Sequence, residues 1–167
     1  MPGLPHSKHC FVCGEDNPDG FRLRFELGDD GHVFLRFNAR RSMQGYGTVM
    51  HGGLQATLLD ETMGWVSTVA VKRMTVAAEL TVRYLQRTPL ESDLVIEAWA
   101  TQVNLRMTRA EAVLRNEDGT VYARAKGKFI PLSLEETKYV DSNLLYQPGD
   151  ARIFGFLEGV EVAEAPV

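Results

Sequence analysis

Two adjacent carboxylates, Asp60 and Glu61, lie inside the stretch MHGGLQATLLDETMGW, residues 50–65, which otherwise has the composition of a buried helix. His51, Gly52 and Gly53 come just before it. The first N–H groups of a helix have no partner within the helix, and glycine lets a ligand oxygen approach them closely. The helix dipole also favours negative charge at this end. These are the requirements of an oxyanion hole, although two glycines before a helix are also common as simple turn chemistry.

The spacing of the acids distinguishes them. At ~100° per residue, Asp60 lies ~20° from the direction of Gly53, whereas Glu61 lies ~80° away from it. Gly53 and Asp60 are nevertheless ~10 Å apart along the axis, too far for one small carbonyl group to touch both. If two such helices lay antiparallel across a twofold axis, Gly53 of one chain could meet Asp60 of the other. Acids that are merely solvated or paired at an interface are the alternative.

A second group of reactive side chains is Cys10 and Cys13 in HCFVCGEDNPDG, with His6 and His9 close by. Zinc usually takes four ligands in tetrahedral geometry, and here all four would come from eight residues. A redox motif would be preceded by a strand and followed by a helix, whereas EDNPDG is typical of a turn. We therefore expect two reduced thiols that pack as small apolar side chains, and no metal ligands.

The elements around this helix show alternating hydrophobicity, which is typical of half-buried strands. The helix itself, from about residue 52 to 71, is apolar almost all round, which predicts burial. Residues 39–50 are expected to form a loop, and the region after Pro131 shows no clear period. The predicted strands are 21–27, 32–38, 75–84, 93–103, 109–115 and 121–129.

Two strands, one helix and four strands predict an α+β fold. Strands joined by short turns are antiparallel neighbours, and a curved antiparallel sheet wrapped around the one long central helix would cover it. We expect an N-terminal segment with the C-x-x-C at 1–20, one compact domain at 21–131 and a C-terminal extension at 132–167.

Overall composition limits the classes of partner. The net charge of −4 argues against a general nucleic-acid surface. The first residues lack an apolar signal core, and the chain has no run of about 18 apolar residues, so we expect a soluble cytoplasmic protein without a membrane span.

The stretch HGGLQATLLDE resembles the signature of hotdog-fold acyl-CoA thioesterases of the PaaI and 4-hydroxybenzoyl-CoA type. In that family an acid follows nine residues after the His of an H-G-G, as Asp60 follows His51. The resemblance covers roughly residues 20–130, and the expected order of elements is also that of the hotdog fold. The opening CFVCGEDNPDGFRLRF resembles an N-terminal segment of some PaaI-type proteins.

The resemblance implies specific roles. The N–H of Gly53, beside Gly52, would bind the thioester carbonyl oxygen, and Asp60 of the other subunit would be general base or nucleophile. His51 would anchor the loop or contact the thioester. The substrate would be an acyl-CoA, no cofactor would be needed, and the protein would be a homo-oligomer, either a dimer or a dimer of dimers.

For the coenzyme A phosphates, the resemblance points to Arg106, with Lys126 and Lys128 as weaker candidates. For the two lysines, a solvated strand face is the preferred interpretation. The sequence also departs from the family. An Asn or Gln often stands six residues before the His, where this chain has Gly45, with Gln44 one position earlier.

Some relatives carry a Ser or Thr on the strand after the helix, where this chain has Ala77. A non-catalytic acyl-CoA-binding protein and a hotdog hydratase or dehydratase therefore remain as alternatives to the thioesterase.

Overall fold

The computed structural model describes residues 1–159. In chain order, its elements are β1 (His6–Ser7), β2 (Phe25–Leu27), β3 (Val33–Asn38), the 3-10 helix η1 (Arg41–Met43), β4 (Gln44–Tyr46), β5 (Val49–Met50), α1 (Gly52–Val71), β6 (Thr75–Tyr84), β7 (Asp93–Gln102), β8 (Thr108–Asn116), β9 (Val121–Pro131), α2 (Leu134–Ser142), β10 (Leu144–Leu145) and the 3-10 helix η2 (Gly155–Leu157).

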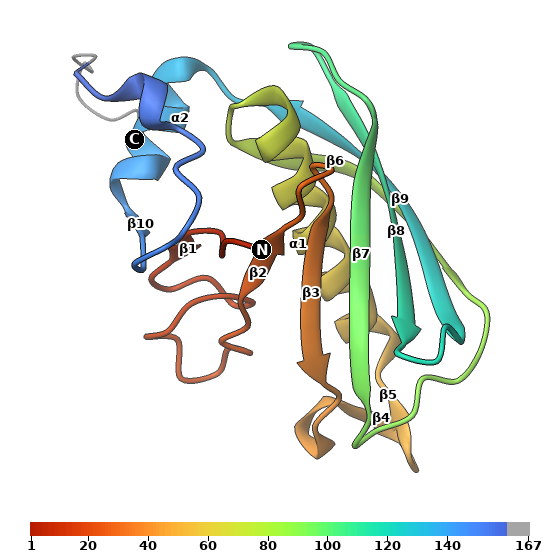
Figure 1. Ribbon diagram of the computed structural model, residues 1–167. Coiled ribbons are helices and arrows are strands. Elements are labelled where there is room, and N and C mark those ends of the chain that lie inside the picture. The colour runs from red at the N-terminus through yellow and green to blue at the C-terminus, as the bar shows by residue number, and fades with distance from the viewer. Residues whose placement is uncertain (160–167) are drawn as a thin grey trace.

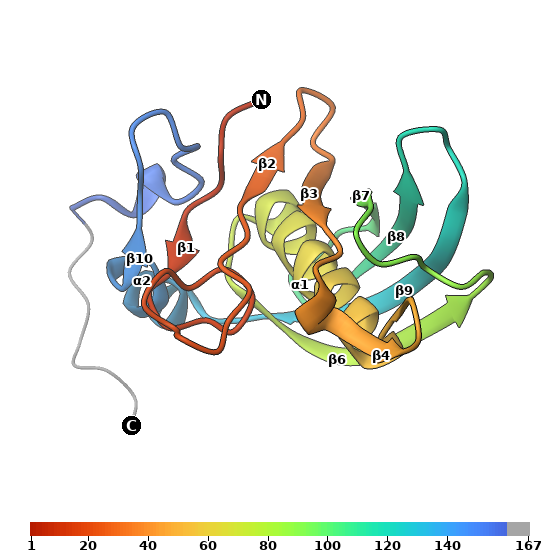
Figure 2. The ribbon, with the colours of Figure 1, turned by 90° about the horizontal axis from the view of Figure 1, so that it is seen from below.

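Six strands form one antiparallel sheet in the order β2-β3-β7-β8-β9-β6. The sheet curls around α1, which lies along its concave face (Figure 1), and the view from below shows the helix held in the curve (Figure 2). The predicted α+β hotdog fold is therefore confirmed. Because β6 is at the end of this order, only one of its two edges is paired with another strand within residues 1–159.

The concave face of the sheet is apolar across neighbouring strands. One row of paired residues consists of Leu35, Ile96, Leu114 and Ala123, all fully buried. A second row of paired residues begins at Val33 and continues with three alanines, whose side chains are short: Ala98, Ala112 and Ala125. Alternating large and small residues in this way lets a helix pack closely on a sheet.

The helix α1 begins and ends near the predicted limits. Leu58, Leu59, Met63 and Val66 are among its buried residues and face the sheet. The helix ends at Val71, and the C-cap residue Lys72 has a left-handed φ of 53°. Although α1 has 20 residues, neither it nor any other helix within residues 1–159 is long and apolar enough to cross a membrane.

The predicted strand 21–27 is wrong in its first half, because only Phe25–Leu27 joins the sheet. Arg22 has a φ of 57°, which interrupts the extended run. The N–H groups of Phe21 and Leu23 donate instead to the carbonyl oxygens of Phe11 and Val12, at 2.8 and 2.9 Å. Residues 21–24 therefore alternate in hydrophobicity as predicted, but the backbone N–H groups of Phe21 and Leu23 bond to the N-terminal segment and not to a neighbouring strand of the sheet.

Two regions contain more regular structure than the sequence predicted. Residues 39–50 include η1 and the short hairpin of β4 and β5. After Pro131 the chain forms α2, which begins with a capping box between Ser133 and Glu136. The spacing S-x-x-E is a known helix start signal, so this helix could have been predicted.

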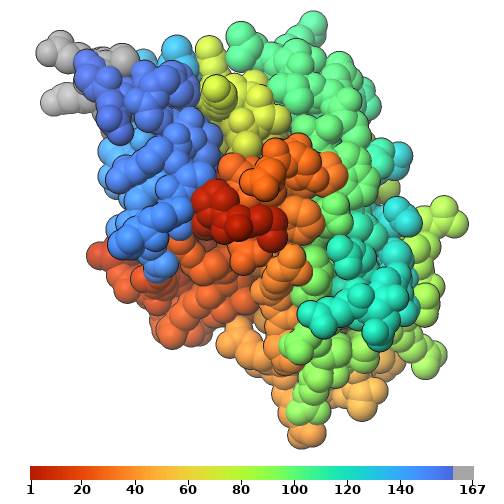
Figure 3. All heavy atoms as spheres, in the orientation of Figure 1, coloured from red at the N-terminus to blue at the C-terminus, as the bar shows by residue number. Residues whose placement is uncertain are grey.

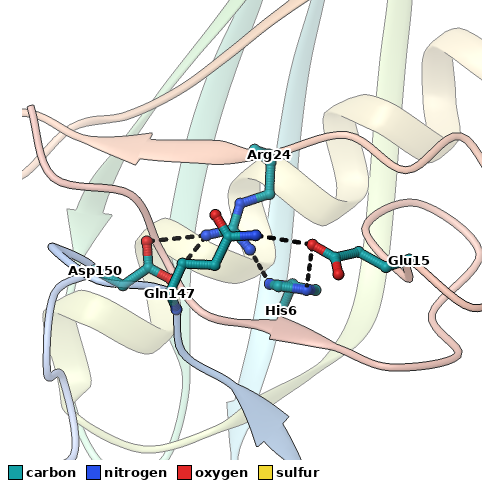
Figure 4. Close-up of polar contacts among 5 residues, drawn as sticks. All are labelled: His6, Glu15, Arg24, Gln147 and Asp150. Atoms are coloured by element: carbon teal, nitrogen blue, oxygen red, sulfur yellow. Dashed lines mark hydrogen bonds and ion pairs between the residues drawn. The ribbon is translucent and has the colours of Figure 1, made fainter.

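The N-terminal segment and the C-terminal extension lie against each other on one side of the domain (Figure 3). They meet through β1 and β10, which pair antiparallel. A polar cluster joins them to the residues before β2 (Figure 4). Arg24 contacts His6 and binds both carboxylate oxygens of Asp150 at 2.9 and 2.7 Å, while Glu15 accepts from Gln147 at 2.9 Å.

Candidate functional site

The start of α1 is capped by its own histidine. His51 is the N-cap residue, and its Nδ1 accepts a hydrogen bond from the N–H of Gly53 at 3.0 Å. The phenol of Tyr84, at the end of β6, donates to the carbonyl oxygen of Gly52 at 2.7 Å. Both groups belong to the peptide unit between Gly52 and Gly53, so that unit is held at its N–H and at its C=O.

This geometry changes which donor is open to a ligand. The family resemblance implied that the N–H of Gly53 would bind the thioester oxygen, but the imidazole of His51 already accepts a hydrogen bond from it. The N–H of Gly52, one residue earlier, makes no hydrogen bond within residues 1–159. Gly52 also borders a pocket of about 380 Å³ with Tyr46, Met50 and Tyr84. Gly52 is therefore a donor at the helix start that is free and also borders a pocket.

The wall of this pocket is fixed by a buried glutamine that sequence reasoning did not single out. Gln55, in the first turn of α1, donates to the carbonyl oxygen of Met50 at 3.1 Å. Its side-chain oxygen accepts from the hydroxyl of Thr88 at 2.9 Å. These bonds fasten β5 and the loop after β6 to the helix start, which holds the Gly52 pocket in shape.

Asp60 lies two turns further along, in different surroundings. It borders a second cavity, of about 260 Å³, lined largely by apolar side chains, among them Trp65, Val76 and Phe129. Its Oδ1 is buried and has no hydrogen-bond partner within residues 1–159. Burial raises the pKa of this carboxyl above its ordinary value. A half-buried carboxylate with a raised pKa and an unused oxygen is suited to accept a proton.

Within one chain these two features do not form a single site. The Gly52 pocket and the Asp60 cavity have no lining residue in common. Eight residues of helix separate Gly52 from Asp60 by ~12 Å along the axis. The two features lie at opposite ends of β6. Thr75 and Val76, at the start of β6, line the Asp60 cavity, and Tyr84, at the end of β6, is hydrogen-bonded to Gly52.

The exposed strand β6 carries apolar side chains that its own chain leaves uncovered. Val76, Leu80 and Tyr84 are 49%, 36% and 49% exposed. Leu80 and Tyr84 pair with Gly127 and Ala123 of β9, which places them on the same side of the sheet as α1. A long unpaired edge with exposed apolar residues is a template for pairing with another strand.

The polar helper expected near the histidine is not in the pocket. Gln44 is exposed at the start of β4 and does not line the pocket around Gly52. A Cβ added at Gly45 would lie 3.1 Å from the Cα of His51, so a larger residue there would press on the histidine. Because successive side chains of a strand point to opposite faces, Gln44 does not take the place of a residue at 45.

The candidate phosphate-binding residues differ in whether they already form ion pairs. Arg106 is exposed in the turn between β7 and β8 and forms no ion pair within residues 1–159. That turn lies at the same end of the sheet as the start of β6. The register shows this, because Arg109, just after the turn, pairs with Lys128, which in turn pairs with Glu79 in the first half of β6. Lys128 forms an ion pair with Glu79 across β6 and β9, and Lys126 with Glu111.

Glu61 faces the two cysteines of the N-terminal segment. Its Oε1 lies 3.6 Å from the Sγ of Cys10 and 3.9 Å from the Sγ of Cys13. Burial, followed by the nearby Cys10, raises the pKa of Glu61 to about 8. The hydrogen bond with Cys13 lowers the pKa of the Cys10 thiol to about 5, and that contact with burial raises the pKa of Cys13. Both acids border the same cavity, but only Glu61 contacts the C-x-x-C, while the Oδ1 of Asp60 has no hydrogen-bond partner within residues 1–159.

Comparison with known proteins agrees with this architecture. Residues 47–123 match the model of the thioesterase superfamily. The chain is 28% identical over 129 residues to bovine (Bos taurus) acyl-coenzyme A thioesterase THEM4, a match that covers 76% of this chain and 53% of the bovine protein. The chain thus spans about half the length of this relative.

Solved structures show the same fold. Protein RHA08564, a thioesterase superfamily protein, superposes with a TM-score of 0.69 at 28% identity, covering 74% of this chain and 63% of that one. The protein smu.793 of Streptococcus mutans UA159, solved with acetyl CoA bound, gives a TM-score of 0.62 at 20% identity, covering 66% of this chain and 89% of its own.

Proposed function

We propose that the chain, whose residues 47–123 match the thioesterase superfamily model, hydrolyses acyl-CoA thioesters at a site built from two copies of the chain. The observation that carries this proposal is the placement of Gly52 and Asp60 at opposite ends of β6, each bordering its own pocket. The activity of bovine THEM4 and the acetyl CoA bound to smu.793 support the choice of substrate class.

Pairing of two β6 strands across a twofold axis would join the two half-sites. In an antiparallel pair centred near the middle of β6, the start of one strand lies opposite the end of the other. Thr75 and Val76, beside Asp60, would then approach Tyr84 of the second copy, which is bonded to Gly52. The pairing would also bury the exposed side chains of Leu80 and Tyr84, which lie on the same side of the sheet as α1. We therefore propose a homodimer, which could assemble further into a dimer of dimers.

In such a site the reaction follows from the groups present. The free N–H of Gly52 would donate to the thioester oxygen and stabilise the charge that develops as the carbonyl carbon becomes tetrahedral. Asp60 of the second copy would take a proton from the attacking water, or attack the carbonyl itself. Breaking the C–S bond would then release the coenzyme A thiol and leave a carboxylic acid. No cofactor is needed for these steps.

Charged groups of the substrate would lie at the rim. Arg106 is the better candidate for the coenzyme A phosphates, because Lys128 is already paired with Glu79. We place the protein in the cytoplasm, where free thiols such as those of Cys10 and Cys13 are kept reduced.

Two other functions are compatible with the fold. A hydratase or dehydratase would use His51 together with an acid, but the Nδ1 of His51 is occupied by the helix cap. A non-catalytic binding protein would bind acyl-CoA without releasing thiol. A panel of acyl-CoAs assayed for free thiol tests the proposal: turnover of at least one of them is expected, whereas binding without release would favour the non-catalytic alternative.

The shared nature of the site can be tested with hybrid dimers. Two variants, one altered at Asp60 and one at Gly52, are co-expressed with different tags, and the mixed dimer is purified. Each parent variant has no intact site, whereas the hybrid has one intact site and one doubly altered site. The hybrid should therefore recover about half of the wild-type activity if the site is shared. An inactive hybrid would show that Gly52 and Asp60 act within one chain.

A further inference from the structure

The N-terminal C-x-x-C and α1 together form a site that the thioesterase reaction does not use. We propose that Cys10, Cys13 and Glu61 bind one zinc ion, which fixes the N-terminal segment to the central helix. One ligand atom from each of these residues lies within 4.8 Å of the others, which the sequence could not reveal because Glu61 is 48 residues away from Cys13. The expectation of two thiols that pack as apolar side chains overlooked this third donor.

The backbone around the cysteines is already arranged to hold a thiolate. The N–H groups of Val12 and Cys13 point at the Sγ of Cys10, at 3.3 and 3.4 Å. The turn closes with a hydrogen bond of 2.9 Å from the N–H of Gly14 to the carbonyl oxygen of Cys10. A Cβ at Gly14 would lie 2.4 Å from that same oxygen, so only glycine fits after the second cysteine. Hydrogen bonds of this kind orient a metal ligand and stabilise its charge.

The two sulfur–oxygen distances in the cluster are close to those of tetrahedral zinc. With Zn–S of about 2.3 Å and Zn–O of about 2.1 Å, tetrahedral angles place a sulfur and an oxygen ligand about 3.6 Å apart. The Oε1 of Glu61 lies 3.6 and 3.9 Å from the two sulfur atoms. One ion can therefore contact all three donors without a large movement of the chain.

A metal ion would balance the charge of the deprotonated cluster. When deprotonated, the two thiols and the carboxyl group are three negative charges, on the buried Cys13 and the half-buried Cys10 and Glu61. None of the ion pairs within residues 1–159 involves Glu61. Buried charges are normally paired or bound to metal ions, and thiolate ligands favour zinc over magnesium or calcium.

Three protein ligands leave one position of the tetrahedron for a water molecule. Cys13 and Glu61 both border the cavity that also contains Asp60, so solvent in that cavity can reach the cluster. The ion would join the segment that carries Cys10 to the helix that carries Asp60. It would therefore support the wall of the Asp60 cavity without taking part in the reaction proposed above.

The first test is metal content. The full chain is purified under reducing conditions without chelators, and its zinc is measured by plasma mass spectrometry. We expect about one zinc ion per chain. After removal of the metal, titration with Co²⁺ should produce the near-ultraviolet charge-transfer band of thiolate ligation and the visible bands of a tetrahedral ion.

A matched pair of variants on adjacent helix positions separates this site from the reaction. Glu61→Gln and Cys13→Ser should each weaken zinc binding by more than the roughly 10–100-fold typical of losing an outer-shell partner. Asp60→Asn should keep the zinc and the cobalt spectrum of the wild type. Asp16→Asn, an exposed acid of the same segment, should also keep both.

Several results would overturn the proposal. Reduced protein that contains no zinc and gives no thiolate band with Co²⁺ would refute the site, and so would a Cys10–Cys13 disulfide in protein kept under reducing conditions. Full zinc affinity in Glu61→Gln would refute Glu61 as the third ligand. Loss of zinc in Asp60→Asn would refute the separation of the two acids. None of these results depends on whether the chain hydrolyses thioesters.

Discussion

The hydroxyl of Tyr84 donates a hydrogen bond of 2.7 Å to the carbonyl oxygen of Gly52, which joins the end of the edge strand β6 to the start of α1. This bond, together with the cap from His51, sets the orientation of the peptide between Gly52 and Gly53. Removing it should therefore affect both stability and the donor geometry of the proposed site.

The variant Tyr84→Phe removes only the hydroxyl. We expect the free energy of unfolding to fall by about 0.5–1.5 kcal/mol, the usual contribution of one hydrogen bond. Tyr46→Phe is a suitable control, because its hydroxyl makes no hydrogen bond within residues 1–159 and its ring borders the same pocket. Chemical denaturation of both variants measures the difference. Equal stability of the two would show that the Tyr84 bond contributes nothing in solution.

The two glycines at the helix start should respond differently to a methyl group. A Cβ at Gly53 would lie 3.0 Å from the imidazole of His51, whereas a Cβ at Gly52 would lie 3.5 Å from the ring of Tyr84, an ordinary contact. Gly53→Ala should displace the cap and cost about 0.5–2 kcal/mol of stability. Gly52→Ala should keep the fold and reduce turnover, because the methyl group crowds the free N–H.

Thermal unfolding and thiol release, measured on both glycine variants, separate these effects. A stable and fully active Gly52→Ala variant would argue against Gly52 as the donor to the thioester oxygen. An unchanged stability of Gly53→Ala would argue against the His51 cap.

The edge of β6 should control assembly. Leu80→Arg places a charge on the exposed apolar side of this strand, where a second copy would bury it unpaired. We expect a monomer without thioesterase activity in Leu80→Arg. Phe156→Arg, an equally drastic change at an exposed aromatic residue of the C-terminal extension, should leave the oligomer intact. Sedimentation velocity provides the measurement, and a monomeric variant with full activity would contradict the shared site.

Arg106 and Lys128 provide a test of phosphate recognition. Arg106→Ala should lower kcat/KM for an acyl-CoA by about 10–100-fold, the range expected when a hydrogen bond to a charged group is lost. Lys128→Ala should have a much smaller effect, since Lys128 is paired with Glu79. The same acyl group on pantetheine, which lacks the nucleotide phosphates, should not distinguish Arg106→Ala from wild type. A loss of equal size on both substrates would place Arg106 outside the phosphate site.

The sequence was sufficient to predict the fold because its patterns are local. Residues 75–84 alternate, and residues 52–71 are apolar all round, so the sheet, the helix and their order followed from periodicity. The start of α2 also had a local signal, the spacing of Ser133 and Glu136, which was overlooked. The false strand at 21–24 shows the limit of such patterns, because its backbone partners, Phe11 and Val12, are not part of the sheet.

The candidate site was predictable only in part, for a related reason. The helical phase predicted different directions for Asp60 and Glu61. Both acids border one cavity, but the Oε1 of Glu61 also faces the sulfur atoms of Cys10 and Cys13. Contacts between distant residues could not be read from spacing, and two of them matter most: Tyr84 with Gly52, and Glu61 with the cysteines. The choice between Gly52 and Gly53 as the free donor also depended on one side-chain hydrogen bond, that of His51.

The most direct test of the proposed reaction compares Asp60→Asn with Glu61→Gln, using one acyl-CoA and the melting temperature as the control for folding. An amide has nearly the shape of a carboxylate but cannot accept a proton from water. Asp60→Asn should keep the fold and lower kcat by at least the ~10²–10⁴-fold typical of losing a general base, whereas Glu61→Gln should lower it far less. An active Asp60→Asn variant beside an inactive, folded Glu61→Gln variant would contradict the role of Asp60.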